Sequence, residues 1–201
     1  DLDIRSGHKI AVTGGNGEGK TTLLSLAAGL DRPSAGRVLV GGVAANALPL
    51  KYRNTRIALL SSRSPVLSGS LRRALTLGLP RRPDDAAILA AAHHFDLDEV
   101  LDRLGGLDGR VSEGGRNLSV GELWRILMAR LGLGAFELIL VDAPETALDH
   151  AGLALLAAEL HRRPSTVLVA TGSTEVATSM GLTVRPLSAQ HGAEPDRQKR
   201  A

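Results

Sequence analysis

The segment from Gly14 to Thr22 combines glycines, one lysine and two hydroxyl side chains in the order that phosphate binding requires. Residues Gly14 to Thr21 read GGNGEGKT and match the pattern GxxxxGK[ST], between a strand-like run, KIAVT, and a helix-like run, TTLLSLAAG. A glycine-rich turn with a surface lysine is the alternative, but it accounts for neither flanking element. Backbone amides, the lysine and a helix-terminal hydroxyl together suit a nucleotide phosphate and Mg²⁺. The candidate nucleotide ligands are Gly14, Asn16, Gly17, Gly19, Lys20, Thr21 and Thr22.

An aspartate, Asp142, follows the apolar run Leu138 to Val141. A carboxylate at the end of a strand in a phosphate-loop protein holds Mg²⁺ through its water shell. The sequence therefore predicts a metal site made by Thr21 and Asp142, with capping of the following helix as the alternative role of Asp142.

A second candidate anion site lies at the segment LSVGE, from Leu118 to Glu122. Ser119 followed by Glu122 forms a capping box, and a helix N-terminus with a hydroxyl and Gly121 attracts an anion. The alternative is that Ser119 only caps its helix.

The elements that must position these residues alternate between strands and helices, which favours an α/β fold. Strands are predicted at Lys9–Thr13, Arg37–Val40, Arg56–Leu60, Leu138–Val141, Thr166–Ala170 and Thr183–Arg185. Helices are predicted at Thr21–Gly29, Leu71–Leu77, Ala86–Phe95, Glu99–Leu104, Gly121–Leu131 and Ala151–His161. We expect a phosphate-loop sheet core over residues 1–187, an inserted helical lobe over about 68–131, and a polar tail over 188–201.

Four features together resemble the nucleotide-binding domain of ABC transporters. LSVGE is similar to the family signature LSGGQ, and LILVDAPETALD is similar to the family strand and loop that end in DEPTSALD. VSEGGRN and PVLSGSL, the latter from Pro65 to Leu71, resemble loops of the exporter type. The resemblance implies a domain that binds ATP and Mg²⁺ and pairs with a second such domain. The γ-phosphate of the ATP held by that second domain would meet Ser119, Gly121 and Glu122.

Three positions depart from that family pattern. Ala143 replaces the glutamate that polarises the attacking water, Thr171 replaces the switch histidine, and Ser62 replaces a glutamine that approaches Mg²⁺. Glu145 lies two residues beyond Ala143, but its side chain is expected to point away from an attacking water.

The family also stacks adenine on an aromatic side chain before the phosphate loop. This chain has none there, and neither Tyr52 nor Trp124 matches that position.

Composition narrows the function further. The net charge is only +3 and the aromatic content is 2%, with arginines scattered through apolar stretches, so a nucleic-acid surface is not expected. The absence of cysteine excludes disulfides and thiolate metal sites. No apolar run approaches the roughly 20 residues of a membrane span.

Since the chain starts at Asp1 and enters a strand almost at once, we expect it to be part of something longer. We expect it at the cytoplasmic face of a membrane, through a transmembrane domain outside this chain.

Three hypotheses for the function follow. The first is a catalytically degenerate half of an asymmetric exporter that binds MgATP, hydrolyses it weakly and pairs with a competent second domain. The second is a self-sufficient ATPase with an unrecognised base. The third is a soluble ABC protein that acts outside transport, on ribosomes or in cell division.

Overall fold

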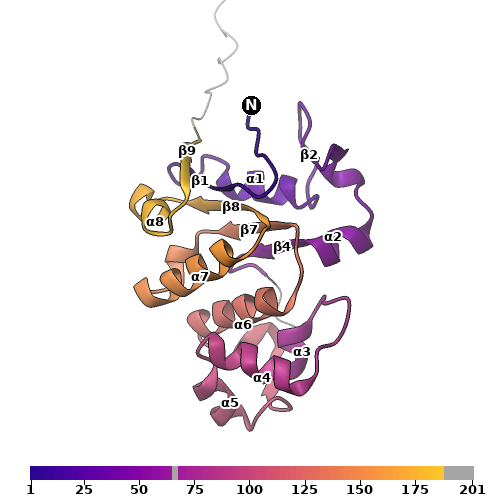
Figure 1. The fold of residues 1–201 in the computed structure, drawn as a ribbon, viewed down its shortest axis with the longest axis vertical. Helices are drawn as coiled ribbons and strands as arrows, with labels where there is room; N and C mark the ends of the chain where they lie inside the picture. The colour runs from indigo at the N-terminus through magenta and orange to yellow at the C-terminus, as the bar shows by residue number, and fades with distance from the viewer. Residues whose placement is uncertain (65–67, 188–201) are drawn as a thin grey trace, which may run out of the picture.

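A computed structural model describes residues 1–64 and 68–187 of the chain. Five parallel strands form one sheet in the order β4-β7-β8-β1-β9 (Figure 1). Their bounds are β1 Lys9–Thr13, β4 Ile57–Leu60, β7 Leu138–Asp142, β8 Thr166–Thr171 and β9 Thr183–Pro186. Because all five strands are parallel, their carboxyl ends share one edge of the sheet, which is where α/β folds place their ligands. The predicted α/β sheet core is confirmed.

The two faces of the sheet are covered by different helices. Alternate residues of the strands, such as Val12 and Leu168, pack on one face with Leu24 of α1 (Lys20–Ala27). Their neighbours, such as Ala11 and Val167, pack on the other face with helices that include α7 (His150–Arg162). This period of two explains why the strand sequences are apolar throughout, since both faces are buried. Two further helices, α2 (Leu50–Arg56) and α8 (Thr174–Ser179), flank the sheet.

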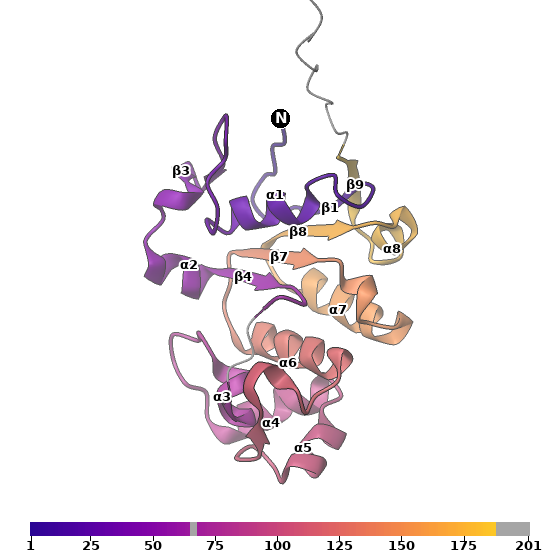
Figure 2. The same cartoon turned by 180° about the vertical axis from the view of Figure 1, so that it is seen from behind.

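Four helices gather at one end of the molecule, away from the sheet edge strand β9 (Figures 1 and 2). They are α3 (Leu71–Thr76), α4 (Asp85–His94), α5 (Asp98–Leu104) and α6 (Val120–Leu133). Trp124 of α6 is fully buried among them, and its indole N–H has no hydrogen-bond partner in the part of the chain that is described. This arrangement fits the helical lobe that the sequence predicts, whose exact limits stay a prediction. The tail over 188–201 lies outside the described residues.

Short ribbons and turns complete the chain. Only Leu39–Val40 of the predicted strand Arg37–Val40 forms a strand, β2, and it pairs with β3 (Val43–Ala44) instead of joining the central sheet. Gly41 and Gly42 cause this, because both have positive φ angles, of 58° and 80°, that fold the chain into a hairpin. The remaining elements are β5 (Gly69–Ser70) paired with β6 (Arg110–Val111), and three 3₁₀ turns at Ala45–Ala47, Glu113–Gly115 and Pro144–Thr146.

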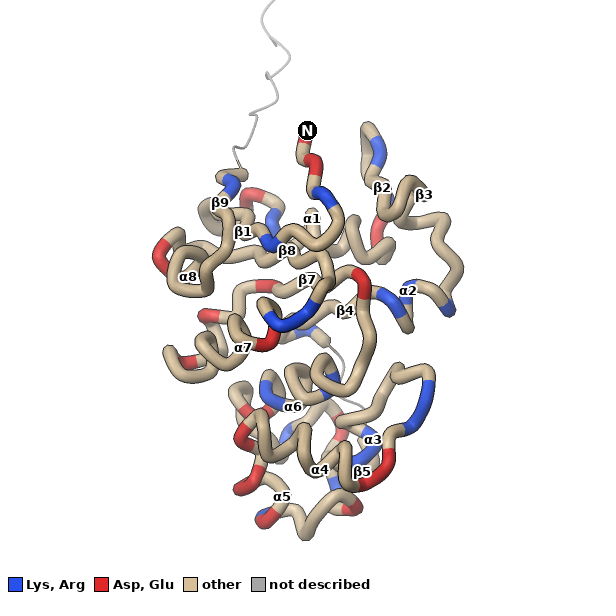
Figure 3. The backbone as a smooth tube through the Cα atoms, in the orientation of Figure 1, with Lys and Arg blue, Asp and Glu red and all other residues tan. Residues whose placement is uncertain are grey.

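Basic and acidic residues are both spread over the described part of the molecule, and helices α5, α6 and α7 each carry both signs (Figure 3). Many arginines are paired: Arg72 bonds Asp85 and Asp108, Arg103 bonds Glu122, and Arg125 bonds Asp96.

Candidate nucleotide site

The phosphate loop connects the end of β1 to the start of α1, as the sequence predicts. Gly17 and Gly19 have φ angles of 83° and 87°, a left-handed region in which only glycine is unstrained. Gly19 is also the N-cap of α1, so the loop leads directly into a helix N-terminus with unpaired amides. Asn16 and Thr22, which the sequence also proposes as ligands, are exposed at this loop and helix start. The loop thus has the backbone shape of an anion site.

Lys20 places its ammonium group over this loop. Its Nζ donates to the carbonyl oxygens of Gly14 and Gly15, at 2.7 Å each. The side chain is thereby bent back over the loop and is not extended into solvent. A positive charge held at this point, beside the amides of α1, is suited to phosphate oxygens.

A carboxylate that the sequence analysis did not consider also contacts the loop. The N–H of Gly15 donates to Oε2 of Glu18 at 2.8 Å. A Cβ atom on Gly14 would lie 2.3 Å from the same oxygen, so glycine at position 14 makes room for this carboxylate. Glu18 therefore brings a negative charge to a loop that otherwise attracts phosphate.

The two proposed metal ligands are brought together by the sheet. The hydroxyl of Thr21 donates to Oδ1 of Asp142 at 3.1 Å. Asp142 is not a helix cap, because the N-cap of α7 is Asp149, whose side chain accepts from the N–H of Gly152. Hard oxygen donors from one hydroxyl and one carboxylate fit Mg²⁺, which keeps several waters and takes further ligands from substrate phosphates.

The signature-like segment forms a helix start of its own. Ser119 Oγ accepts from the N–H of Glu122 at 3.1 Å, and Glu122 Oε2 accepts from the N–H of Ser119 at 2.7 Å. This is the capping box that the sequence predicts. Arg103 pairs with Glu122, and Val120 is 54% exposed beside them. Among the described residues, no hydrogen bond joins Ser119, Gly121 or Glu122 to the phosphate loop.

Electrostatics keep Glu122 ionised. Burial raises the pKa of its carboxyl, but hydrogen bonds from Ser119 and the guanidinium of Arg103 outweigh burial and lower the pKa below its ordinary value. The start of α6 therefore carries a paired negative charge.

The three positions that depart from the family pattern lie around the sheet edge. Ala143 follows β7 with a left-handed backbone, at φ 48° and ψ 56°, and its N–H donates to the carbonyl of Ala170. Thr171 ends β8 and is fully buried, whereas Ser62 is exposed in a turn just after β4. None of these three side chains is a carboxylate, an imidazole or an amide.

Glu145 occupies a place that sequence reasoning did not foresee. Its Oε1 accepts from the Thr171 hydroxyl at 2.7 Å and from the N–H of Gly172 at 2.9 Å. Its Oε2 is buried and has no hydrogen-bond partner among the described residues. A carboxylate thus reaches the end of β8 from the loop after β7. The signal available in the sequence was the glutamate in DAPETALD, where the related pattern DEPTSALD has threonine.

Residues 1–13, which precede the phosphate loop, contain no Phe, Tyr or Trp on which adenine could stack. The hydroxyl of Tyr52 on α2 donates to Glu137 at 2.6 Å, and Trp124 is buried in the helical lobe. Neither ring lies before the phosphate loop.

A match between most of the chain and one protein family establishes which family this chain belongs to. Residues 1–146 match the family described as ABC transporter. The chain belongs to this family. It is an ATP-binding domain of an ABC transporter, and domains of this family bind ATP together with Mg²⁺.

The relatives of the domain include transport proteins that are much longer than this chain. Mycobactin import ATP-binding/permease protein IrtB of Mycolicibacterium thermoresistibile is 39% identical over 163 residues, which cover 80% of this chain and 28% of that protein. ATP-dependent lipid A-core flippase of Chromobacterium violaceum is 32% identical over 177 residues, covering 85% of this chain and 30% of that protein. The chain therefore spans less than a third of these relatives.

A solved structure supports the same fold. A bacterial Atm1-family ABC exporter with ATP bound superposes with a TM-score of 0.81 over 96% of this chain and 34% of that chain, at 22% sequence identity. In the described part of this ATP-binding domain, no helix has both the length and the apolar character that a membrane crossing needs.

Proposed function

We propose that this domain binds MgATP and hydrolyses it only weakly at its own site, as one half of an unequal pair of ATP-binding domains in a transporter. The observation that carries the proposal is a contrast at one sheet edge. The phosphate loop, Lys20 and the pair Thr21–Asp142 are present there and would hold phosphate and Mg²⁺. By contrast, Ala143 and Thr171 stand at the two positions that the family uses for hydrolysis.

Binding would rest on the phosphate loop. The amides at the start of α1 and the Lys20 ammonium would hold the phosphates, and Thr21 and Asp142 would hold Mg²⁺. The metal would offset phosphate charge when bound. None of these groups depends on Ser62, Ala143 or Thr171.

Slow hydrolysis follows from the side chain of Ala143. A methyl group neither accepts a proton nor orients a water molecule, and a positioned general base contributes roughly 10²- to 10⁴-fold to rate. Ala143 directly follows β7, so this methyl group stands where the family has its glutamate.

A second ATP-binding domain would complete the arrangement. Ser119, Gly121 and Glu122 lie at the start of α6, where Ser119 is exposed and the other two are partly buried. Among the described residues, none of them has a hydrogen bond to this chain's own phosphate loop. In an asymmetric pair they would face the nucleotide of the partner domain, which would supply the missing glutamate and histidine at its own site.

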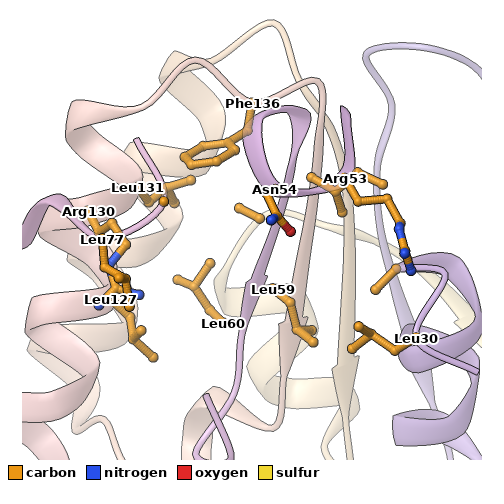
Figure 4. A pocket seen from close by; sticks show the side chains of 14 residues that line it. Leu30, Arg53, Asn54, Leu59, Leu60, Leu77, Leu127, Arg130, Leu131 and Phe136 are labelled. Carbon is orange, nitrogen blue, oxygen red and sulfur yellow. The ribbon is translucent and has the colours of Figure 1, made fainter. Parts of the chain in front are cut away.

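A membrane domain is the other proposed partner, and it would place this domain at the cytoplasmic face of the membrane. The chain corresponds to less than a third of the length of each of the two relatives, and one of them is named an ATP-binding/permease protein. A hollow of about 470 Å³ lies between the sheet edge at β4, the end of α2 and the helices α3 and α6 (Figure 4). It is mainly apolar and open, and it provides a surface on which a membrane domain would rest.

The hollow is separate from the nucleotide site. Figure 4 shows Leu30, Leu59 and Leu60 lining it together with Leu127 and Phe136. None of the phosphate-loop residues lines it. Leu30 is 63% exposed, which leaves an apolar side chain at the rim for a partner.

The deciding experiment follows the fate of bound nucleotide. The purified domain is incubated with Mg²⁺ and labelled ATP, the bound fraction is isolated over hours, and its nucleotide is identified. Persistent ATP supports the proposal, while rapid conversion to ADP contradicts it. A Lys20→Ala variant, which removes the phosphate-binding charge, serves as the control for specific binding.

A second candidate function, a self-sufficient ATPase, is favoured by one observation: the Glu145 carboxylate lies at this sheet edge. Turnover separates the two functions. If the domain uses another base, Ala143→Glu changes turnover little. Under the proposal, turnover at this site rises only when Ala143→Glu is combined with Thr171→His.

A further inference from the structure

The hydroxyl of Thr171 stands at the phosphate end of the sheet. Thr171 pairs with Thr13 in the parallel register of β8 and β1, and Thr13 directly precedes the phosphate loop. On the other side of β8, Ala170 pairs with Asp142. Since neighbouring strands lie about 4.8 Å apart, the end of β8 lies between the phosphate loop and the proposed Mg²⁺ ligand.

That hydroxyl is already engaged. A threonine hydroxyl has one proton to donate, and two acceptors are near it: Glu145 Oε1 at 2.7 Å and the carbonyl of Ser173 at 3.4 Å. The carboxylate contact is the shorter one and is charge-assisted, so it takes the proton. The oxygen of Thr171 also accepts from the N–H of Ser173 at 3.1 Å.

The carboxylate also fixes the backbone that follows. Gly172 donates its N–H to the same Oε1 of Glu145 at 2.9 Å. One oxygen therefore ties the end of β8 and the loop after it to the loop after β7. Thr171 is fully buried, so its hydroxyl does not exchange this acceptor for bulk water.

We propose that Glu145 is a positioning residue that holds the Thr171 hydroxyl away from the nucleotide, so that the γ-phosphate gains no hydrogen bond at this position. The inference rests on the proposed function, because it assumes that the γ-phosphate lies at the end of β8. It predicts a site that binds triphosphate and diphosphate with similar strength.

The test measures the ratio of the dissociation constants of MgADP and MgATP, by calorimetry at short times with the bound nucleotide checked afterwards. Glu145→Ala leaves the hydroxyl with only the more distant carbonyl of Ser173, at 3.4 Å, as an acceptor among the described residues, so we expect it to donate to the γ-phosphate. Because hydrogen bonds to charged groups are among the stronger ones, we expect the ratio to shift about tenfold in favour of MgATP. MgADP, which has no γ-phosphate, should bind as in the unchanged protein.

Two further variants separate the hydrogen bond from the charge. Glu145→Gln keeps a carbonyl oxygen that accepts from Thr171 and Gly172, so its ratio should stay within about twofold of the unchanged protein. In a Thr171→Val background there is no hydroxyl to free, so adding Glu145→Ala should leave the ratio unaltered. The exposed Glu175 on α8 provides a matched control, Glu175→Ala.

The outcomes are distinct. Failure of the unchanged protein to bind either nucleotide contradicts the proposed function. If it binds both, equal ratios in the Glu145→Ala and unchanged proteins overturn the positioning role. Equal weakening of both nucleotides indicates a structural role only, and an equal gain in Glu145→Gln indicates charge repulsion; each overturns the inference. Melting temperatures confirm that each variant is folded.

Discussion

The hydroxyl of Thr21 and Oδ1 of Asp142 lie 3.1 Å apart, although 121 positions separate the residues in the chain. The sheet order explains this contact. β8 stands between β1 and β7, and α1 leaves the phosphate loop to pack across both β7 and β8. The first turn of α1 is thereby placed at the carboxyl end of β7.

The pair should control the dependence of nucleotide binding on Mg²⁺. We expect Asp142→Asn to weaken MgATP binding by about 1.5–3 kcal/mol, because a charged acceptor is lost. Binding measured in EDTA should change little. Titrations with and without Mg²⁺ check this, with Thr21→Val as the companion variant. Asp142 has no role with the metal if Asp142→Asn retains the full difference between the two conditions.

Glu18 should weaken all nucleotide binding through its charge. We expect Glu18→Gln to raise the affinity for MgATP and MgADP by roughly two- to fivefold, in the range of exposed charge interactions. The gain should shrink as salt is added. Titration of both nucleotides at low and high ionic strength measures it. A gain confined to MgATP would not fit, since Glu18 contacts the loop and not the end of β8.

Ala143 carries backbone strain that glycine should relieve. Its φ of 48° is costly for any residue with a Cβ atom. Glycine also raises the conformational entropy of the unfolded chain, which reduces this gain. After that reduction, Ala143→Gly should stabilise the domain by roughly 0.5–1 kcal/mol. Ala147, at φ −135°, is the matched control, where the same change should destabilise. Urea unfolding measures both, and equal destabilisation of the two variants would show that strain is absent.

The capping box should make stability depend on pH through Glu122. Its pKa lies below the ordinary value of 4.5 in the folded protein, so the unfolded state binds the proton more readily. The stabilisation is therefore present above about pH 4.5 and is lost as pH falls through the lowered pKa. Glu122→Ala should cost about 1 kcal/mol at pH 7 and progressively less below pH 4.5. Unfolding by urea across this pH range checks the sign, and a cost that grows in acid contradicts it.

Glu159 should be the most sensitive acidic residue outside the site. Its fully buried side chain pairs with Arg162 and with Arg163. Arg163 also donates to the carbonyls of Gly132 and Gly134 at the end of α6. Removing one partner of a buried pair costs about 3–5 kcal/mol, so Glu159→Ala should lower stability by that amount. Urea unfolding followed by circular dichroism measures it. A loss under 1 kcal/mol would mean that water reaches the pair.

The features predicted from sequence were those with strong local signals. The phosphate loop is framed by a buried strand and a helix start, and Ser119 and Glu122 form a capping box within four residues. Each depends on neighbours in the chain, so spacing alone was enough.

The features that were missed depend on tertiary contacts or have weak patterns. Helix α2 contains no buried residue, so it has no apolar period to detect. The bond between Glu145 and Thr171 joins residues 26 positions apart, and only the pairing of β7 with β8 brings them together. The contact of Glu18 with Gly15 depends on a backbone turn that the pattern GxxxxGK does not specify.

The burial of Trp124 has a practical consequence. It is the only tryptophan of the chain, and it lies in the helical lobe with no hydrogen-bond partner among the described residues. Its fluorescence therefore comes from one apolar environment, distant in sequence from the phosphate loop. Any spectral shift on adding nucleotide would report rearrangement of the lobe itself, without an attached dye.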